Sequence, residues 1–186
     1  DVKIGDVRME VKNWTVYHCL YPDRKIVDNV SFNVRKGEVV GISGLMGAGR
    51  SKLAISLFGN SYGSKLEGDL IIDGEKVVFK NVRDAIDHKM AYVTDDRKGK
   101  GLILSKSIKE NTTLANLDSI SKRKVIDMHK EVEVAEEYRK KLKTKTPSIE
   151  QNVGNLSGGN QQKVLLAKWM FAEPDILILD EPTRGI

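Results

Sequence analysis

One stretch decides the fold of this chain: Gly44-Leu45-Met46-Gly47-Ala48-Gly49-Arg50-Ser51. Residues 38–43 before it, which include Val39, Val40 and Ile42, predict a buried strand, and residues 50–58 after it predict a helix. A glycine-rich turn between a strand and a helix lets backbone N–H groups converge on phosphate oxygens at the positive end of the helix dipole. The stretch therefore predicts a phosphate-binding loop, although such a turn by itself also fits an ordinary tight connection.

The residues of this loop have separate reasons to contact phosphate. Glycines allow a backbone approach that side chains would block, and a hydroxyl at the end of the loop is placed to bind Mg²⁺. Arg50 stands where such loops usually carry lysine, and its long planar fork is not equivalent to a compact ammonium. The candidate phosphate ligands are Gly44, Gly47, Ala48, Gly49, Arg50 and Ser51.

Two further motifs follow downstream. Residues 156–162 read Leu-Ser-Gly-Gly-Asn-Gln-Gln, and Ser157 caps a helical pattern over residues 159–171, whose N-terminus is free to face an anion. The apolar strand 176–179 then leads into two carboxylates. Asp180 can hold magnesium through water, and Glu181 can orient or deprotonate an attacking water. Each motif alone has an ordinary structural explanation. The occurrence of all three in this order, however, is very improbable by chance.

In this order the motifs resemble those of the ATP-binding subunits of ABC transporters. Residues 44–51 correspond to the Walker A loop, residues 156–162 to the signature motif and residues 176–181 to the Walker B strand. The resemblance implies an α/β P-loop NTPase fold of the ABC ATPase type, with a mainly parallel core sheet, an antiparallel β layer and a helical subdomain. It implies ATP and Mg²⁺ as cofactors. It also assigns roles near the metal and the attacking water: Ser51, Asp95 and Asp180 on the metal side, and Glu181 as the catalytic base.

The resemblance also implies a sandwich of two ATP-binding halves around two ATP molecules. In that sandwich, Ser157, Gly158, Gly159 and Gln161 complete the nucleotide site of the partner half. The antiparallel strands of such subunits stack an aromatic residue on the adenine. Tyr21 occupies the expected place, with Tyr17 as the second choice, and either also fits as a surface or sheet-packing tyrosine.

Two short segments narrow the resemblance to bacterial monosaccharide importers: residues 160–163, Asn-Gln-Gln-Lys, and residues 95–98, Asp-Asp-Arg-Lys. Three other segments look most like the xylose or multiple-sugar members: residues 14–18, 21–25 and 153–157. In that group one polypeptide carries two ATP-binding halves, and Arg50 is typical of the C-terminal half. The implied partners are an N-terminal half of the same polypeptide, transmembrane permease subunits and, indirectly, a periplasmic or lipoprotein sugar-binding protein. The implied function is a peripheral ATPase at the cytoplasmic face of the membrane that drives import of xylose or a related sugar.

Two departures from the general ABC pattern favour a rival function. Arg50 replaces the usual lysine, and Asp95 replaces the usual glutamine of the Q-loop and cannot donate a hydrogen bond when ionised. Both fit a regulatory half that binds ATP without hydrolysing it, whereas the intact pair Asp180-Glu181 argues against it. A third possibility is a soluble ABC ATPase acting on nucleic acid or ribosomes, but its expected coiled coil or basic arm is missing from the sequence.

Composition agrees with an ordinary globular domain. The 186 residues include 31 Lys and Arg against 26 Asp and Glu, so the net charge is only +5; the acidic residues are interspersed, which argues against a nucleic-acid partner. Cys19 is the only cysteine and cannot form an internal disulfide. No apolar run approaches 18 residues. The sequence stops at residues 185–186, inside the expected D-loop, and no histidine follows Walker B; we therefore expect a truncated, inactive fragment.

Local patterns suggest three segments of an incomplete ABC domain: residues 1–96 (β layer and P-loop core), 97–155 (helical subdomain) and 156–186 (signature helix and Walker B strand). Alternation predicts antiparallel strands within residues 7–40, and Asp73-Gly74 predicts a hairpin within residues 68–79. Other predicted elements are helices at 82–88 and 128–143 and a strand at 90–93. The longer helix places these side chains on one face: Val132, Ala135, Tyr138 and Leu142.

Overall fold

The computed structural model describes residues 3–59 and 62–183, so the expected D-loop end at residues 185–186 lies outside the described residues. The chain forms two compact units, Asp1–Met90 and Ala91–Ile186. The sequence suggested boundaries after residues 96 and 155. The structure places its division after Met90 and groups the helical segment with the signature helix.

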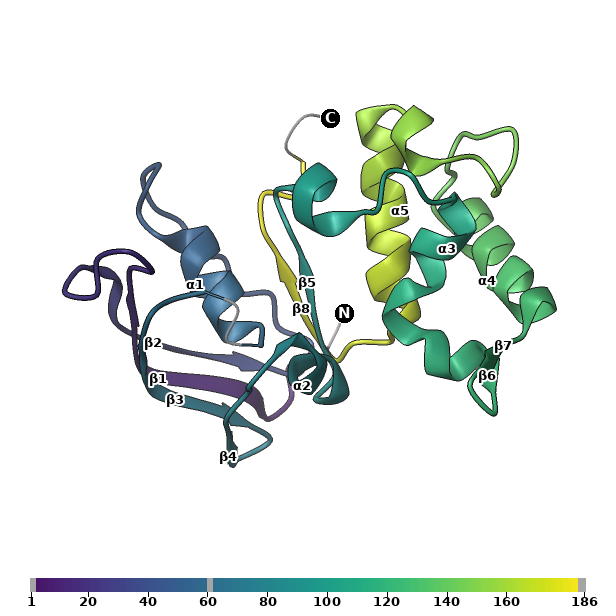
Figure 1. The fold of residues 1–186 in the computed structure, drawn as a ribbon. Coiled ribbons are helices and arrows are strands. Elements are labelled where there is room, and N and C mark those ends of the chain that lie inside the picture. Colours follow the sequence, from purple (N-terminus) through teal and green to yellow (C-terminus); the bar gives the residue numbers. More distant parts are fainter. Residues whose placement is uncertain (1–2, 60–61, 184–186) are drawn as a thin grey trace. The chain divides into compact units, whose positions relative to one another are not determined.

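The first unit is built on a four-stranded antiparallel sheet in the order β2-β1-β3-β4 (Figure 1). Its strands are β1 (Val7–Tyr17), β2 (Lys25–Arg35), β3 (Leu66–Ile72) and β4 (Glu75–Val77). Long β1 pairs with both β2 and β3, and every pairing is antiparallel. The predicted antiparallel layer is therefore confirmed.

The turn between β3 and β4 follows from two residues. Asp73 has φ 51° and Gly74 has φ 83°, the paired positive values that a two-residue type I′ hairpin requires. The predicted hairpin is confirmed. Gly68, earlier on β3, has φ 100°, and a Cβ there would lie 2.5 Å from the Lys12 carbonyl oxygen, so only glycine fits at this irregularity of the β1–β3 pairing.

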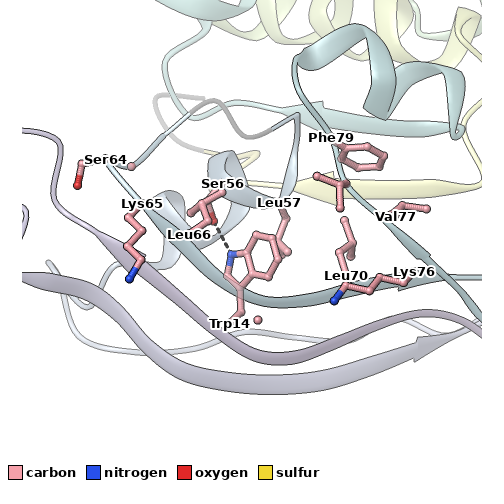
Figure 2. A pocket seen from close by; sticks show the side chains of 13 residues that line it. Trp14, Ser56, Leu57, Ser64, Lys65, Leu66, Leu70, Lys76, Val77 and Phe79 are labelled. Carbon is pink, nitrogen blue, oxygen red and sulfur yellow. Dashed lines mark hydrogen bonds between the residues drawn. The ribbon is translucent and has the colours of Figure 1, made fainter.

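Helix α1 (Arg50–Leu57) packs on this sheet. Leu53 and Leu57 are buried, and the indole Nε1 of Trp14 on β1 donates a 2.9 Å hydrogen bond to Ser56 Oγ. Figure 2 shows this bond among the residues that line a pocket. The pocket has a volume of about 400 Å³ and is lined mainly by residues 63–65, by α1, β3 and β4, and by Phe79. None of the residues predicted to bind nucleotide lines it. The shorter α2 (Val82–Asp87) is capped at its N-terminus by Asn81, whose side chain accepts a hydrogen bond from the Asp84 N–H.

The strand predicted at residues 38–43 is absent from the described part of the chain. Val39 is 96% exposed and Ile42 51% exposed. A strand needs a hydrogen-bonded neighbour, and the described sheet of the first unit ends its pairing at Arg35 of β2 and Val7 of β1. Apolar composition indicated a segment suited to burial, but it could not supply a pairing partner.

The second unit contains three packed helices and a two-stranded sheet (Figure 1). The helices are α3 (Ile108–Thr113), α4 (Met128–Lys141) and α5 (Gly158–Phe171). The paired strands are β5 (Met90–Val93), whose first residue is the last of the first unit, and β8 (Ile176–Leu179). Short elements connect them: a π-helical turn η1 (Arg97–Gly101), the 3-10 segments η2 (Leu114–Ile120) and η3 (Val153–Asn155), and the hairpin β6 (Ser121–Lys122) with β7 (Val125–Ile126). No helix among the described residues is both long and apolar enough to cross a membrane.

Helix α4 differs from its predicted face at one position. Ala135 and Tyr138 are buried as the spacing indicated, but Val132 is 39% exposed. Glu131 is buried beside them because its carboxylate accepts a 3.2 Å hydrogen bond from Thr113 Oγ1 and lies 3.9 Å from Lys109 Nζ. Polar partners on α3 therefore bury an acidic residue that a hydrophobic pattern places outside.

Candidate functional site

The glycine-rich loop has the backbone shape of an anion-binding turn. Gly47 has φ 84° and Gly49 has φ 85°, and Gly49 directly precedes the first residue of α1. Residues in the left-handed conformation just before a helix direct successive backbone N–H groups toward one point. This arrangement favours binding of an anion. Between these glycines, the Ala48 N–H donates 3.1 Å to the Leu45 carbonyl and closes a turn.

Two of the three glycines, Gly49 and Gly47, are required, and for different reasons. A Cβ on Gly49 would lie 2.6 Å from the Ile26 carbonyl oxygen of β2. A Cβ on Gly44 would lie 3.3 Å from the Ala48 Cβ, a tight but tolerable contact. Around Gly47 there is open space, so its positive φ alone demands glycine.

Arg50 and Ser51 form the first turn of α1, and both are half-buried. The first turn of an α-helix leaves N–H groups without intrahelical acceptors, and α1 has no acidic residue there to compete for them. The N-terminus of α1 is therefore suited to an anion, and Arg50 and Ser51 lie on its first turn.

The two candidate adenine-stacking tyrosines lie in different surroundings. Tyr21 lies in the turn between β1 and β2, is 62% exposed, and its ring centroid is 5.1 Å from that of His18. Tyr17, at the end of β1, donates a 3.3 Å hydrogen bond to Glu67. Tyr21 is thus the more exposed of the two, and its role as the stacking residue stays a prediction.

Asp180 is a buried carboxylate at the end of β8. It is 8% exposed, its N–H donates 2.9 Å to the Val93 carbonyl on β5, and its Oδ2 accepts a 2.9 Å hydrogen bond from the Tyr92 hydroxyl. Burial raises the pKa of the Tyr92 phenol; a hydrogen bond from Thr94 lowers it, and the bond to Asp180 raises it further. The phenol therefore remains a protonated donor at neutral pH.

Sequence reasoning missed Tyr92 as a site residue. The available signal was its hydroxyl within the short apolar run Met90-Ala91-Tyr92-Val93, where a buried phenol needs a hydrogen-bond partner.

Glu181 contrasts with its neighbour Asp180. It is exposed, and its φ of 42° lies in the left-handed region that few non-glycine residues adopt. Such backbone strain concentrates at functional sites. One buried and one exposed carboxylate at the end of a single strand can take two roles, one toward a metal and one toward water.

Asp96 organises the loop after β5. The Asp96 carboxylate accepts a 2.9 Å hydrogen bond from the Gly99 N–H and begins the π-helical turn η1. Its own N–H donates 3.1 Å to Thr94 Oγ1. Asp95 is half-buried at the start of this loop, and its predicted contact with metal remains a prediction.

The signature motif forms the N-terminus of α5. Ser157 is exposed, and its side chain makes no capping hydrogen bond to the helix backbone; its Oγ accepts a 3.1 Å bond from the Asn160 amide. Gly158 and Gly159 form the first turn and are half-buried. Gln161 points inward: it is 3% exposed and donates to the carbonyls of Val153 and Leu156, both at 3.2 Å.

Of the predicted site residues, the structure brings Asp180 and Glu181 close to the loop that begins at Asp95. Asp180 and Glu181 lie beside β5, whose chain continues directly into the Asp95 loop, and all belong to the second unit. The loop of residues 44–51 and Tyr21 belong to the first unit. No group of three or more His, Cys, Asp or Glu that could hold a metal occurs among the described residues. The Asp180 carboxylate is a donor of the kind that Mg²⁺ takes, because this ion is usually bound by one or two carboxylates, water and the phosphates of its nucleotide.

Comparison with known families matches residues 27–184 to the ABC transporter family. The L-arabinose transport ATP-binding protein AraG of Geobacillus stearothermophilus is 56% identical over 184 residues, which cover 99% of this chain and 36% of that protein. The xylose import ATP-binding protein XylG of Thermoanaerobacter pseudethanolicus is 52% identical over 182 residues, 98% of this chain and 36% of that protein. The chain thus spans about a third of the length of these relatives.

Solved structures share the fold. A dimeric post-hydrolysis state of the ATP-binding cassette MJ0796 bound to ADP and Pi has a TM-score of 0.79 at 24% identity, covering 96% of this chain and 75% of that one. A nucleotide-free ATP-binding cassette from an ABC transporter has a TM-score of 0.78 at 21% identity, covering 97% and 71%. These likenesses confirm the predicted α/β fold of the ABC ATPase type. With a family match over most of its length and close relatives along nearly all of it, the chain belongs to the ABC transporter family.

Proposed function

We propose that this chain is the nucleotide-binding domain of a monosaccharide importer, in which it binds and hydrolyses ATP. The observation that carries the proposal is the pair at the end of β8: buried Asp180, held by Tyr92, next to exposed Glu181. A regulatory domain that only binds nucleotide has no use for the exposed second carboxylate. The relatives named for arabinose, xylose and ribose transport support a sugar as the cargo.

The predicted site residues would have separate roles in ATP binding and hydrolysis. The P-loop residues Gly44, Gly47, Ala48, Gly49, Arg50 and Ser51 would hold the phosphates. Asp180 and Ser51 would hold Mg²⁺, with Asp95 as a third candidate, and the ion would neutralise phosphate charge. Glu181 would accept a proton from water as the water oxygen bonds to the γ-phosphorus and the bond from phosphorus to the β–γ bridging oxygen breaks.

The N-terminus of α5 would complete a second site on a partner half. Ser157, Gly158 and Gly159 start a 14-residue helix, so its N–H groups can face an ATP held by another P-loop. Gln161 would act indirectly, because its amide holds the carbonyls of Val153 and Leu156 just before the motif. The partner would be an N-terminal ATP-binding half of the same polypeptide, consistent with relatives about three times the length of this chain.

The remaining partners follow from the same assignment. Transmembrane permease subunits would carry the sugar, a periplasmic or lipoprotein sugar-binding protein would deliver it, and this domain would lie at the cytoplasmic face of the membrane. Relatives named for xylose and arabinose favour a pentose among the possible sugars.

The rival is a half that binds ATP without hydrolysing it, which Arg50 and Asp95 favour. The test compares wild type with Glu181→Gln in the assembled transporter, measuring ATP turnover and, separately, binding of a fluorescent ATP analogue. We expect binding within twofold of wild type and turnover reduced at least about 100-fold, the usual loss when a general base is removed.

Glu173→Gln is the matched control, since Glu173 is also exposed and has a similar φ of 49°. It should leave turnover unchanged. Equal turnover in wild type and Glu181→Gln would support the regulatory rival, and a wild type that binds no nucleotide would refute the proposed function itself.

A further inference from the structure

A chain of hydrogen bonds runs from the loop after β5 to the Asp180 carboxylate. The Asp96 N–H donates 3.1 Å to Thr94 Oγ1, the Thr94 hydroxyl hydrogen-bonds the Tyr92 phenol, and that phenol donates 2.9 Å to Asp180 Oδ2. The three side chains that form these hydrogen bonds are buried: Tyr92 is 7% exposed, Thr94 5% and Asp180 8%. Water therefore competes little for these bonds, and each donor is directed at one acceptor.

Asp180 is held at two points by the same strand. Its backbone N–H bonds to the Val93 carbonyl at 2.9 Å, and its side chain bonds to the neighbouring residue Tyr92. With main chain and carboxylate both anchored to β5, one oxygen of Asp180 is committed to the phenol. The direction in which the carboxylate presents its remaining acceptor capacity is therefore set by Tyr92.

We propose that Tyr92 is a positioning residue: its phenol orients Asp180 for the Mg²⁺ of a bound nucleotide and, through Thr94, links that orientation to the loop that begins at Asp95. The inference rests on the proposed function, which gives Asp180 its metal. Groups that hydrogen-bond a metal-ligating carboxylate fix its orientation, and their removal typically lowers metal affinity 10- to 100-fold. Tyr92 makes this contact from the strand that leads into the loop, so a shift of the loop would alter how the carboxylate is held.

The test uses Tyr92→Phe in the purified protein. Binding of a fluorescent ATP analogue is titrated at increasing Mg²⁺, and again in EDTA. We expect the Mg²⁺ concentration for the half-maximal effect to rise about tenfold, at the lower end of the range for such contacts, while affinity in EDTA stays within twofold. A purely structural role for Tyr92 would lower both affinities together.

Three variants accompany it. Tyr138→Phe removes a hydroxyl from another buried tyrosine, on α4, and should leave the Mg²⁺ dependence unchanged. Thr94→Val breaks the link to the loop but keeps the phenol, so it should raise the half-maximal Mg²⁺ concentration by less than Tyr92→Phe. Asp180→Asn removes the carboxylate itself and should abolish most of the Mg²⁺ effect.

The outcomes separate the two proposals. If Asp180→Asn abolishes the Mg²⁺ effect and Tyr92→Phe shifts it less than twofold, Tyr92 does not position Asp180. If Asp180→Asn leaves the Mg²⁺ effect intact, the metal role of Asp180 in the proposed function is wrong, and the inference on Tyr92 falls with it.

A second measurement needs no substitution at Tyr92 and covers the case of a Tyr92→Phe protein that does not fold. Wild type and Asp180→Asn are labelled with 3-fluorotyrosine at the five tyrosines, and ¹⁹F spectra are recorded with ATP before and after Mg²⁺. One resonance should differ between the two proteins, and that same resonance should move with Mg²⁺ in wild type. If no resonance meets both conditions, the proposal is overturned.

Discussion

The Nζ of Lys168, on α5, donates a hydrogen bond to the backbone carbonyl of Gly101, the last residue of the π-helical turn η1. The helix and the turn are close here, since a Cβ on Gly101 would lie 3.0 Å from the Leu165 side chain. Burial lowers the pKa of Lys168 from 10.5 to about 8. A lysine on the signature helix thus holds the π-helical turn that follows Asp95, the candidate metal residue in the loop after β5.

The first prediction concerns how the contribution of Lys168 to the free energy of unfolding depends on pH. The folded chain loses the Lys168 proton near pH 8, whereas the unfolded chain keeps it to about 10.5, so the unfolded state binds more protons between these values. The contribution of Lys168 to the free energy of unfolding should therefore rise with pH from 8 toward 10.5, by up to about 3 kcal/mol. Lys168→Met should remove that rise.

Urea denaturation at pH 7, 8, 9 and 10 measures the contribution of Lys168 as the difference in free energy of unfolding between wild type and Lys168→Met. Lys163→Met is the matched control, because Lys163 also donates to a backbone carbonyl, that of Lys143, from a less buried position on α5. A wild-type-minus-variant difference that does not change with pH for Lys168→Met would contradict the prediction.

Gly49 and Gly47 should respond differently to alanine. Both have positive φ, so each substitution carries the left-handed penalty of about 1–2 kcal/mol. Only at Gly49 does the new Cβ also meet a backbone carbonyl, that of Ile26, at 2.6 Å. We expect Gly49→Ala to lower the free energy of unfolding clearly more than Gly47→Ala; equal losses in urea denaturation would show that the Ile26 contact yields without cost.

Arg50 should contribute binding energy at the P-loop. If its guanidinium contacts phosphate, Arg50→Ala should weaken binding of a fluorescent ATP analogue by about 1.5–3 kcal/mol, the loss of one charge-assisted hydrogen bond. Arg50→Lys, which keeps the charge, should retain most of the affinity. Arg83→Ala removes an exposed arginine from α2 of the same unit and serves as the control. Unchanged affinity in Arg50→Ala would mean that Arg50 does not touch phosphate.

Ser157→Arg should separate nucleotide binding from turnover. Ser157 is exposed at the open end of α5, where an arginine would fill the space that a partner's ATP is expected to occupy. ATP turnover of the assembled transporter should be lost, while affinity for nucleotide at this chain's own P-loop stays within twofold. Ser119→Arg, at another exposed serine, should preserve both. Normal turnover in Ser157→Arg would rule out the sandwich role of this motif.

Several elements could be predicted from the sequence because their signals are local. Asp73 and Gly74 made the hairpin between β3 and β4 predictable, since a type I′ turn needs residues that tolerate positive φ. The helix at α5 likewise followed from adjacent residues, with a serine at its start and a proline shortly after its end. The glycines of the P-loop belong to the same class, because backbone conformation is decided by the residue itself.

The sequence by itself therefore determined the hairpin between β3 and β4, helix α5, the P-loop glycines and the family, because each depends on neighbouring residues or on motifs in fixed order. Only the tertiary structure decided the contacts between distant positions: Tyr92 with Asp180, 88 residues apart, and Lys168 with Gly101, 67 residues apart. It also decided that Glu131 is buried, since that depends on polar partners on another helix. Periodicity reports which side of an element is apolar, whereas the partner of a buried polar group is chosen by packing, which no local pattern encodes.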